Sequence, residues 1–227
     1  MIEEHGRAED DDIWVITGDF DNKTYSRNSG GHVEAATIEV NNHPQLKLAL
    51  HFVTKIPNAI IAGGAARDIL MNKKLSDKTD IDIFIGGENS ESGMARQLIE
   101  ITSFCRSLNI TPHLVNDESN MPGLRLKAGN LDLFLLGYMP DSIFDLVTRF
   151  DMVSSQAWLV PWLNGFNVHC TELSRQLRER NVMGYYPGYR MDSSNHIFRV
   201  SERFPEHVLL QLSYRATDDN YNDPLPF

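Results

Sequence analysis

One stretch of the chain reads Ile60-Ile61-Ala62-Gly63-Gly64-Ala65-Ala66-Arg67-Asp68-Ile69-Leu70. Its apolar start is typical of a buried strand, two glycines follow, and a helix is predicted from about Ala65 onward. Two glycines between a strand and a helix let a ligand approach the backbone and the amide groups at the start of the helix. This geometry suits a triphosphate. For Gly63-Gly64 taken alone, a strand–turn–helix corner without a ligand is the alternative.

A second pattern follows directly, at Thr79–Ile85, where polar and apolar residues alternate as in a strand. Side chains two residues apart on a strand lie on the same face, so Asp80 and Asp82 are predicted to stand side by side, with isoleucines on the opposite face. Two neighbouring carboxylates repel each other unless a divalent cation neutralises them. The alternative for this pair alone is an ordinary face exposed to solvent.

Asp132 interrupts an otherwise apolar strand predicted over Leu131–Leu136. An unpaired buried carboxylate costs several kcal/mol of folding free energy, so this one needs a partner. A metal ion or a basic side chain would serve, and so would solvent at the edge of a sheet.

The rest of the chain alternates between strand-like and helix-like segments. Strands are predicted at Ile13–Phe20, Val33–Val40, Thr111–Asn116 and Gly123–Lys127, with a tight turn at Ala128–Asn130. Helices are predicted at Asn42–Ile56, Ser92–Leu108, Ser142–Arg149, Phe150–Leu159, Leu173–Arg180 and Ile197–Leu212. The predicted fold class is α/β, or α+β in the stricter sense. It has a small mixed sheet with helices mainly on one side and a short helical C-terminal extension.

The composition is that of an ordinary globular protein, with 227 residues, 41% of them hydrophobic. The 31 acidic and 21 basic residues give a net charge of −10, which argues against sequence-blind adhesion to nucleic acid through clustered Lys and Arg. The two cysteines, Cys105 and Cys170, match no metal-ligand or disulfide pattern. We find no signal peptide and no membrane-spanning run, so we expect a cytoplasmic protein that does not contact a membrane.

Taken in order, Gly63-Gly64, Asp80-Ile81-Asp82 and Asp132 resemble the motifs of the DNA polymerase beta-like nucleotidyltransferase superfamily. The first two are similar to the head domain of tRNA CCA-adding enzymes and bacterial poly(A) polymerases, where Gly-Gly-x-x-Arg-Asp-x-Leu precedes Asp-hydrophobic-Asp. The later segment Thr148–Met152 is similar to that family's Arg-Arg-Asp-Phe motif, with Phe150 at the place of the second Arg. The arrangement also resembles compact nucleotidyltransferase-like proteins of tailed bacteriophages.

This resemblance implies an enzyme that uses an NTP as substrate and two Mg²⁺ ions as cofactors. The implied catalytic and metal-binding residues are Asp80, Asp82 and Asp132. The implied nucleotide-binding residues are Gly63, Gly64, Arg67, Arg149 and Asp151. Asp68 is expected to have a structural role, bonded to the local backbone or to Arg67. The implied division of the chain is an N-terminal tail and peripheral strand arm at 1–41, a nucleotidyltransferase core at 42–165, and a helical extension with a loose tail at 166–227.

Three functions are compatible with these motifs. The first is transfer of NMP from an NTP to an acceptor hydroxyl at an RNA (tRNA-like) 3′ end. The second keeps the chemistry and places the NMP on a protein hydroxyl, as in AMPylation by antitoxin-like nucleotidyltransferases. The third is a non-catalytic phage protein that binds a nucleotide or a partner. If the chain is phage-encoded, the expected compartment is the host cytoplasm.

Overall fold

The computed structural model describes residues 14–16, 32–87, 90–115, 123–136, 143–186 and 193–212. The predicted N-terminal tail before residue 14 and the predicted loose tail at 218–227 lie outside these residues. The described helices are α1 (Leu46–Lys55), α2 (Gly64–Leu70), α3 (Glu91–Ser107), α4 (Ile143–Val147), α5 (Glu172–Glu179) and α6 (Ser193–Arg203), with short 3₁₀ turns η1 (Val40–Asn42) and η2 (Val153–Ser155). The described strands are β1 (Trp14–Ile16), β2 (His32–Glu39), β3 (Ala59–Ala62), β4 (Ile81–Ile85), β5 (His113–Val115), β6 (Gly123–Ala128), β7 (Leu131–Leu136), β8 (Ala157–Trp162), β9 (Gly165–Thr171), β10 (Val182–Tyr185) and β11 (Val208–Leu212).

Eight of these strands form one mixed sheet in the order β2-β9-β8-β3-β4-β7-β6-β5. Strands β4 and β7 run parallel at its centre, and every other neighbouring pair in this sheet is antiparallel. Strand β4 carries Asp82 and strand β7 carries Asp132, so the parallel pairing of these two strands sets the relative position of the two acids. The mixed sheet predicted from the sequence is confirmed.

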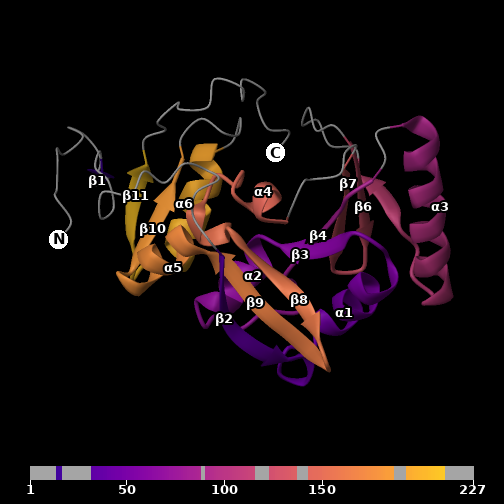
Figure 1. Ribbon diagram of the computed structural model, residues 1–227, viewed down its shortest axis with the longest axis horizontal. Helices are drawn as coiled ribbons and strands as arrows, with labels where there is room; N and C mark the ends of the chain where they lie inside the picture. The colour runs from indigo at the N-terminus through magenta and orange to yellow at the C-terminus, as the bar shows by residue number, and fades with distance from the viewer. Residues whose placement is uncertain are drawn as a thin grey trace.

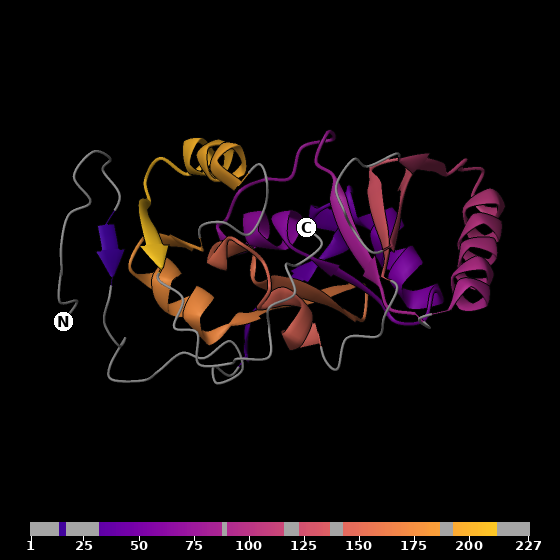
Figure 2. The same ribbon diagram turned by 90° about the horizontal axis from the view of Figure 1, so that it is seen from above.

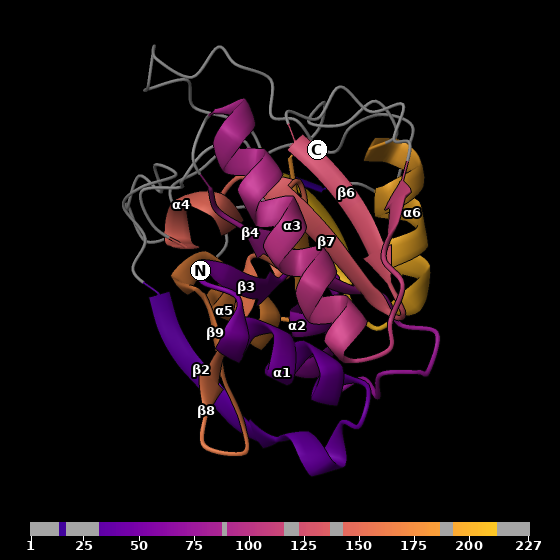
Figure 3. The ribbon, with the colours of Figure 1, turned by 90° about the vertical axis from the view of Figure 1, so that its right-hand side faces the viewer.

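Helices α1, α2 and α3 pack against one face of the sheet and share a single hydrophobic core with it. Figure 3 shows α1 and α3 crossing this face. Ile81, Ile83 and Ile85 of β4 point into this core, as their alternation predicted. Helix α4 packs on the opposite face, in a separate cluster that includes Phe84 of β4. The expectation that most helices lie on one side is therefore confirmed, with α4 as an addition on the other face.

A smaller sheet lies at the end of the molecule opposite α3, where β10 and β11 stand beside α5 and α6 (Figures 1 and 2). Its order is β1-β11-β10, and both pairings are parallel. Strand β1 comes from the N-terminal segment. Strands β2 and β9 also join segments far apart in sequence, because they pair with each other at the edge of the large sheet. Both sheets thus draw on residues from outside 42–165, and the division into three segments stays a prediction.

One helix prediction was wrong and another was only partly correct. Phe150–Leu159 contains the 3₁₀ turn η2 and the start of β8 instead of a helix. The β8 residues are almost continuously apolar, a pattern that fits a buried strand as well as a buried helix. Pro161 is tolerated in β8 because it lies beyond the residues that pair with β3. The predicted helix Ile197–Leu212 stops at Arg203 because Pro205 cannot continue it, and β11 follows.

The C-terminal segment is therefore mixed in structure, with β9, β10 and β11 besides its two helices. Among the described residues, no helix combines the length and apolar character needed to cross a bilayer.

Candidate active site

Two of the predicted catalytic aspartates lie directly opposite each other on the parallel pair β4 and β7. Asp82 is the register partner of Asp132. Both follow core-facing residues by one position, so they lie on the sheet face that carries Phe84 and Phe134, away from the main core. The third acid, Asp80, immediately precedes β4 and is exposed, whereas Asp132 is only 2% exposed. The parallel pairing thus brings two acids from distant sequence motifs to one position.

The two-glycine turn lies beside Asp82. Gly63 ends β3 and precedes α2 with φ 83° and ψ −133°, a conformation that residues with a side chain rarely adopt. A Cβ placed on Gly63 would lie 3.6 Å from the Asp82 Oδ2 atom and the same distance from the Phe150 ring. A Cβ on Gly64 would lie 3.9 Å from the same carboxylate oxygen. The predicted nucleotide-binding turn and the predicted catalytic acid therefore share one site.

Arg67 and Asp68 form a buried pair behind this turn. The Arg67 Nε and Nη2 atoms donate to Asp68 Oδ1 at 3.1 and 3.0 Å, and its Nη1 donates to Ser155 Oγ at 3.2 Å. Arg203, at the end of α6, places its Nη2 atom 2.5 Å from Asp68 Oδ2. The contact expected between Asp68 and Arg67 is confirmed. Arg67 is 6% exposed, and its guanidinium reaches toward Gly64, where Nη2 would lie 3.7 Å from an added Cβ.

The contact between α6 and Asp68 gives a first prediction. Replacing Arg203 with Met should lower the free energy of unfolding by about 1 kcal/mol, because Asp68 is buried and loses one of its two cationic partners while the Arg203 side chain is partly exposed. Arg199→Met is the matched control, since Arg199 lies exposed on the same helix. Equal urea midpoints for the two variants would contradict this role of Arg203.

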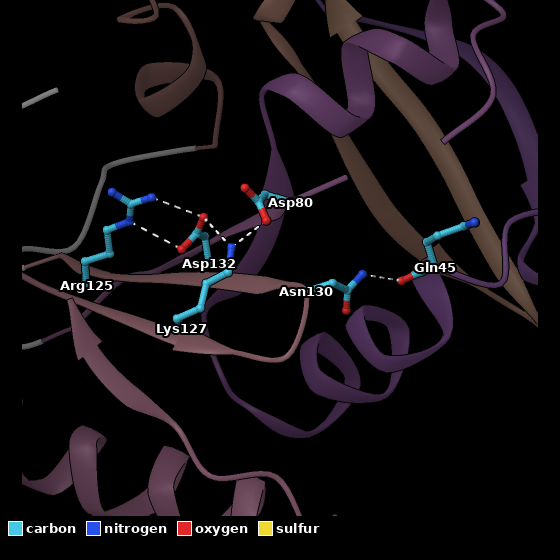
Figure 4. A network of polar contacts seen from close by, with 6 residues as sticks. All are labelled: Gln45, Asp80, Arg125, Lys127, Asn130 and Asp132. Carbon is cyan, nitrogen blue, oxygen red and sulfur yellow. Dashed lines mark hydrogen bonds and ion pairs between the residues drawn. The ribbon is translucent and has the colours of Figure 1, made fainter. Parts of the chain in front are cut away.

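Two basic residues of β6 that the sequence analysis did not select contact the acids (Figure 4). The Lys127 Nζ atom donates to Asp80 Oδ1 at 2.5 Å and to Asp132 Oδ2 at 3.1 Å. The Arg125 Nε and Nη2 atoms donate to the two oxygens of Asp132 at 3.3 and 3.2 Å. Burial opposes the charge on Lys127, but its hydrogen bonds to Asp80 and Asp132 outweigh that effect and raise its pKa. Asp132 therefore has the basic partners that its burial requires.

A sequence signal for Lys127 exists in the β6–β7 hairpin. Gly129 and Asn130 form its two-residue turn, with Gly129 at φ 64°, so that Ala128 pairs with Leu131 and Lys127 with Asp132. The Asn130 side chain also anchors the turn by donating to the backbone oxygen of Gln45 at 3.1 Å (Figure 4). A tight turn was predicted here, and extending its register by one residue would have placed Lys127 opposite Asp132.

Asp82 has a strongly perturbed carboxyl group. Burial and, to a smaller extent, the neighbouring charges of Asp132 and Asp80 raise its pKa to about 7, although Arg125 and Arg67 act in the opposite direction. A carboxyl group held this close to other acids is typical of a functional site.

The perturbed carboxyl group gives a second prediction. Because the folded-state pKa of about 7 lies above the unfolded value of about 3.9, the wild-type protein should lose stability as the pH rises between these two values. Asp82→Asn lacks this loss, so without divalent cations it should be more stable than wild type above pH 7, by on the order of 2 kcal/mol, and similar near pH 4. Urea unfolding in EDTA at several pH values measures the difference. A gain that does not change with pH would contradict the assignment.

The remaining two predicted nucleotide-binding residues lie in the turn after α4. Arg149 is partly buried and precedes Phe150, whose ring lies 5.5 Å from that of Phe84 and borders Gly63. Asp151 is 6% exposed, and its Oδ2 lies 2.8 Å from the Nδ1 atom of His196 on α6. Its Oδ1 accepts from the Met152 amide at 2.9 Å. Phe150 therefore lies beside the two-glycine turn, and Asp151 contacts α6 through His196.

The donor set of this site suits a divalent cation. Three carboxylates supply oxygen ligands of the kind that Mg²⁺ prefers, and a cation would offset their mutual repulsion, which adds to the effect of burial on the pKa of Asp82. Within the described residues, no three His, Cys, Asp or Glu side chains converge as a metal site would. The ammonium group of Lys127 instead bridges two of the three acids.

The structure is similar to solved CCA-adding enzymes. A Thermotoga maritima CCA-adding enzyme complexed with tRNA matches with a TM-score of 0.49 and 15% identity over 78% of this chain and 43% of that chain. A CCA-adding enzyme in complex with CTP matches with a TM-score of 0.48 and 15% identity, covering 74% of this chain and 41% of that one. A structure described as a tRNA-processing enzyme matches with a TM-score of 0.45 and 18% identity, over 78% and 46%.

The chain thus spans less than half the length of these solved structures. No protein-family model matches it, and neither does any curated protein.

Proposed function

We propose that the protein is a Mg²⁺-dependent nucleotidyltransferase that transfers NMP from an NTP to an acceptor hydroxyl, with an RNA 3′ end as the acceptor. The observation that supports this most directly is the placement of Asp82 and Asp132 side by side on parallel strands, next to the positive-φ turn at Gly63. Two neighbouring acids suit a divalent cation, which in turn can bind a phosphate chain.

In this proposal, Asp80, Asp82 and Asp132 hold the cation through their carboxylate oxygens. Bound Mg²⁺ supplies positive charge that stabilises the phosphate oxygens as negative charge develops on them. Gly63 and Gly64 leave the backbone beside Asp82 open to the phosphates, because a side chain there would occupy the space next to the carboxylate. Arg67, which reaches toward Gly64, adds positive charge behind the turn and is held in place by Asp68.

The bond changes then follow from the site. The acceptor oxygen forms a bond to the α-phosphorus, the bond from that phosphorus to the oxygen bridging to the β-phosphate breaks, and pyrophosphate leaves. The proton of the acceptor hydroxyl passes to a carboxylate, for which Asp132 is the candidate because it faces Asp82 across the parallel pair. Arg125 orients the Asp132 carboxylate through two hydrogen bonds.

One observation favours a second candidate function, a non-catalytic protein that binds a nucleotide or a partner. Bringing three acids together without a metal ion costs folding free energy, and this cost alone favours a metal site. Lys127 and Arg125 reduce that cost by pairing with Asp80 and Asp132. A protein without catalytic activity can therefore retain these acids, because basic side chains balance their charge.

Label transfer separates these functions. The protein is incubated with Mg²⁺ and each NTP carrying a label on its α-phosphate, in the presence of total RNA and total protein. Label in RNA supports the proposed function. Label on a protein band, with a mass gain of one NMP, keeps the chemistry and changes the acceptor. Label in neither fraction, despite measurable NTP binding, supports the non-catalytic candidate.

A further inference from the structure

Lys127 lies between two of the three acids, Asp80 and Asp132, and is hydrogen-bonded to both. Its ammonium nitrogen lies 2.5 Å from an oxygen of Asp80 and 3.1 Å from an oxygen of Asp132 (Figure 4). Asp80 immediately precedes β4 and Asp132 lies in β7, so a single positive group links the start of β4 to β7. That link is what a divalent cation between the same carboxylates would provide.

The two basic residues of β6 differ in how firmly they are held. Arg125 contacts both oxygens of the buried Asp132, and its guanidinium lies 5.3 Å from the centre of the Phe134 ring. Lys127 makes one hydrogen bond to each of its two acids, and one of these acids, Asp80, is 58% exposed. A lysine has a flexible four-carbon stem and strong affinity for water, so its ammonium can turn out toward solvent at this open side. Arg125 can remain on Asp132 while Lys127 moves.

We propose that Lys127 is an internal counter-ion that competes with the divalent cation for Asp80 and Asp132. In the cation-free protein it neutralises the acids, and the cation binds as the Lys127 ammonium leaves them. This inference rests on the cation site of the proposed function, and it adds a residue that sets the affinity of that site.

The first test is Mn²⁺ binding measured by titration calorimetry in the absence of nucleotide. Lys127→Met removes the competing charge and keeps the length of the side chain, so it should bind Mn²⁺ about tenfold more tightly than wild type, the scale expected when hydrogen bonds between charged groups no longer have to break. Lys78→Met is the control, because it removes an exposed positive charge near Asp80. It should change the affinity by less than about twofold.

The outcomes distinguish the competition by Lys127 from the existence of the cation site. Equal affinities for wild type and Lys127→Met, or a gain of the same size in Lys78→Met, would overturn the competition and leave the cation site in place. No binding of Mn²⁺ to any of the proteins would overturn both the competition and the cation site of the proposed function.

A measurement on the wild-type protein does not depend on the folding of a variant. Lysines are acetylated briefly with an amine-reactive reagent, with and without Mg²⁺, and the labelled fraction at each site is read by mass spectrometry. Release of the Lys127 ammonium from its two acids should raise its labelling by about threefold or more on addition of Mg²⁺, since a paired ammonium is protected from reaction. The labelling of Lys78 should not change. Unchanged labelling of Lys127 would contradict its displacement.

Discussion

Replacing Asp82 with Asn is expected to lower the rate of nucleotidyl transfer by about 10³-fold or more. This loss is the rate equivalent of roughly 4 kcal/mol, within the range that a bound metal ion contributes to stabilising charge in a transition state. Asn keeps the shape of Asp and removes the charge that lies between Asp132, Asp80 and the turn at Gly63. The measurement is the initial rate of label transfer from NTP to the acceptor.

The same variant should be folded, because Asn relieves the repulsion among the three acids. Glu100→Gln is the matched control, since it removes an exposed carboxylate on α3, at the far end of the molecule from α6. It should retain the wild-type rate. An Asp82→Asn protein with near wild-type transfer would show that the acids on β4 and β7 are not the reaction centre.

Replacing Gly63 with Ala is expected to weaken NTP binding by about 10- to 100-fold. The conformation of Gly63, with φ 83° and ψ −133°, costs a residue with a Cβ about 1–3 kcal/mol. The variant relieves this strain by shifting the turn, and binding a nucleotide must then restore the original conformation. The same free energy reappears as a loss of affinity. Titration calorimetry with NTP and Mg²⁺ measures it.

A loss of stability alone could also weaken NTP binding. The control variant should therefore lose a similar amount of stability at a position away from the turn. Val168→Ala removes buried side-chain volume from β9, away from the turn, and should cost about 1–2 kcal/mol of stability. At a temperature well below both unfolding midpoints it should bind NTP as wild type does. Equal affinities of Gly63→Ala and Val168→Ala would contradict a role for the turn in binding phosphates.

The acids of the site could be predicted because their signals are local. The alternation in β4 fixes which residues face the core, and it holds in the structure for the three isoleucines. The apolar surroundings of Asp132 also show that it requires a partner. One of its partners, Lys127, follows from the register of a two-residue hairpin, so that part of the site was within reach of the sequence, whereas Arg125 lies opposite Phe134 and reaches Asp132 diagonally.

Other features depend on contacts between distant segments and leave no local signal. Arg203 meets Asp68, and His196 meets Asp151, only because α6 packs beside the turns that hold these acids. The start of strand β8 was predicted as the end of a helix because an apolar segment fits either structure, and the pairing of β8 with β9 and β3 settles the choice. Tertiary packing, which the pattern of a single segment does not encode, decides such cases.

The most direct measurement is calorimetric binding of NTP with and without Mg²⁺, on the wild-type protein and on the double variant Asp80→Ala/Asp82→Ala. If the acids and the two-glycine turn form a nucleotide site, wild type binds at least one NTP, Mg²⁺ strengthens the binding, and the double variant loses that strengthening. Binding that is independent of Mg²⁺, equal in a well-folded double variant, or undetectable for every NTP would contradict the proposed nucleotidyltransferase site.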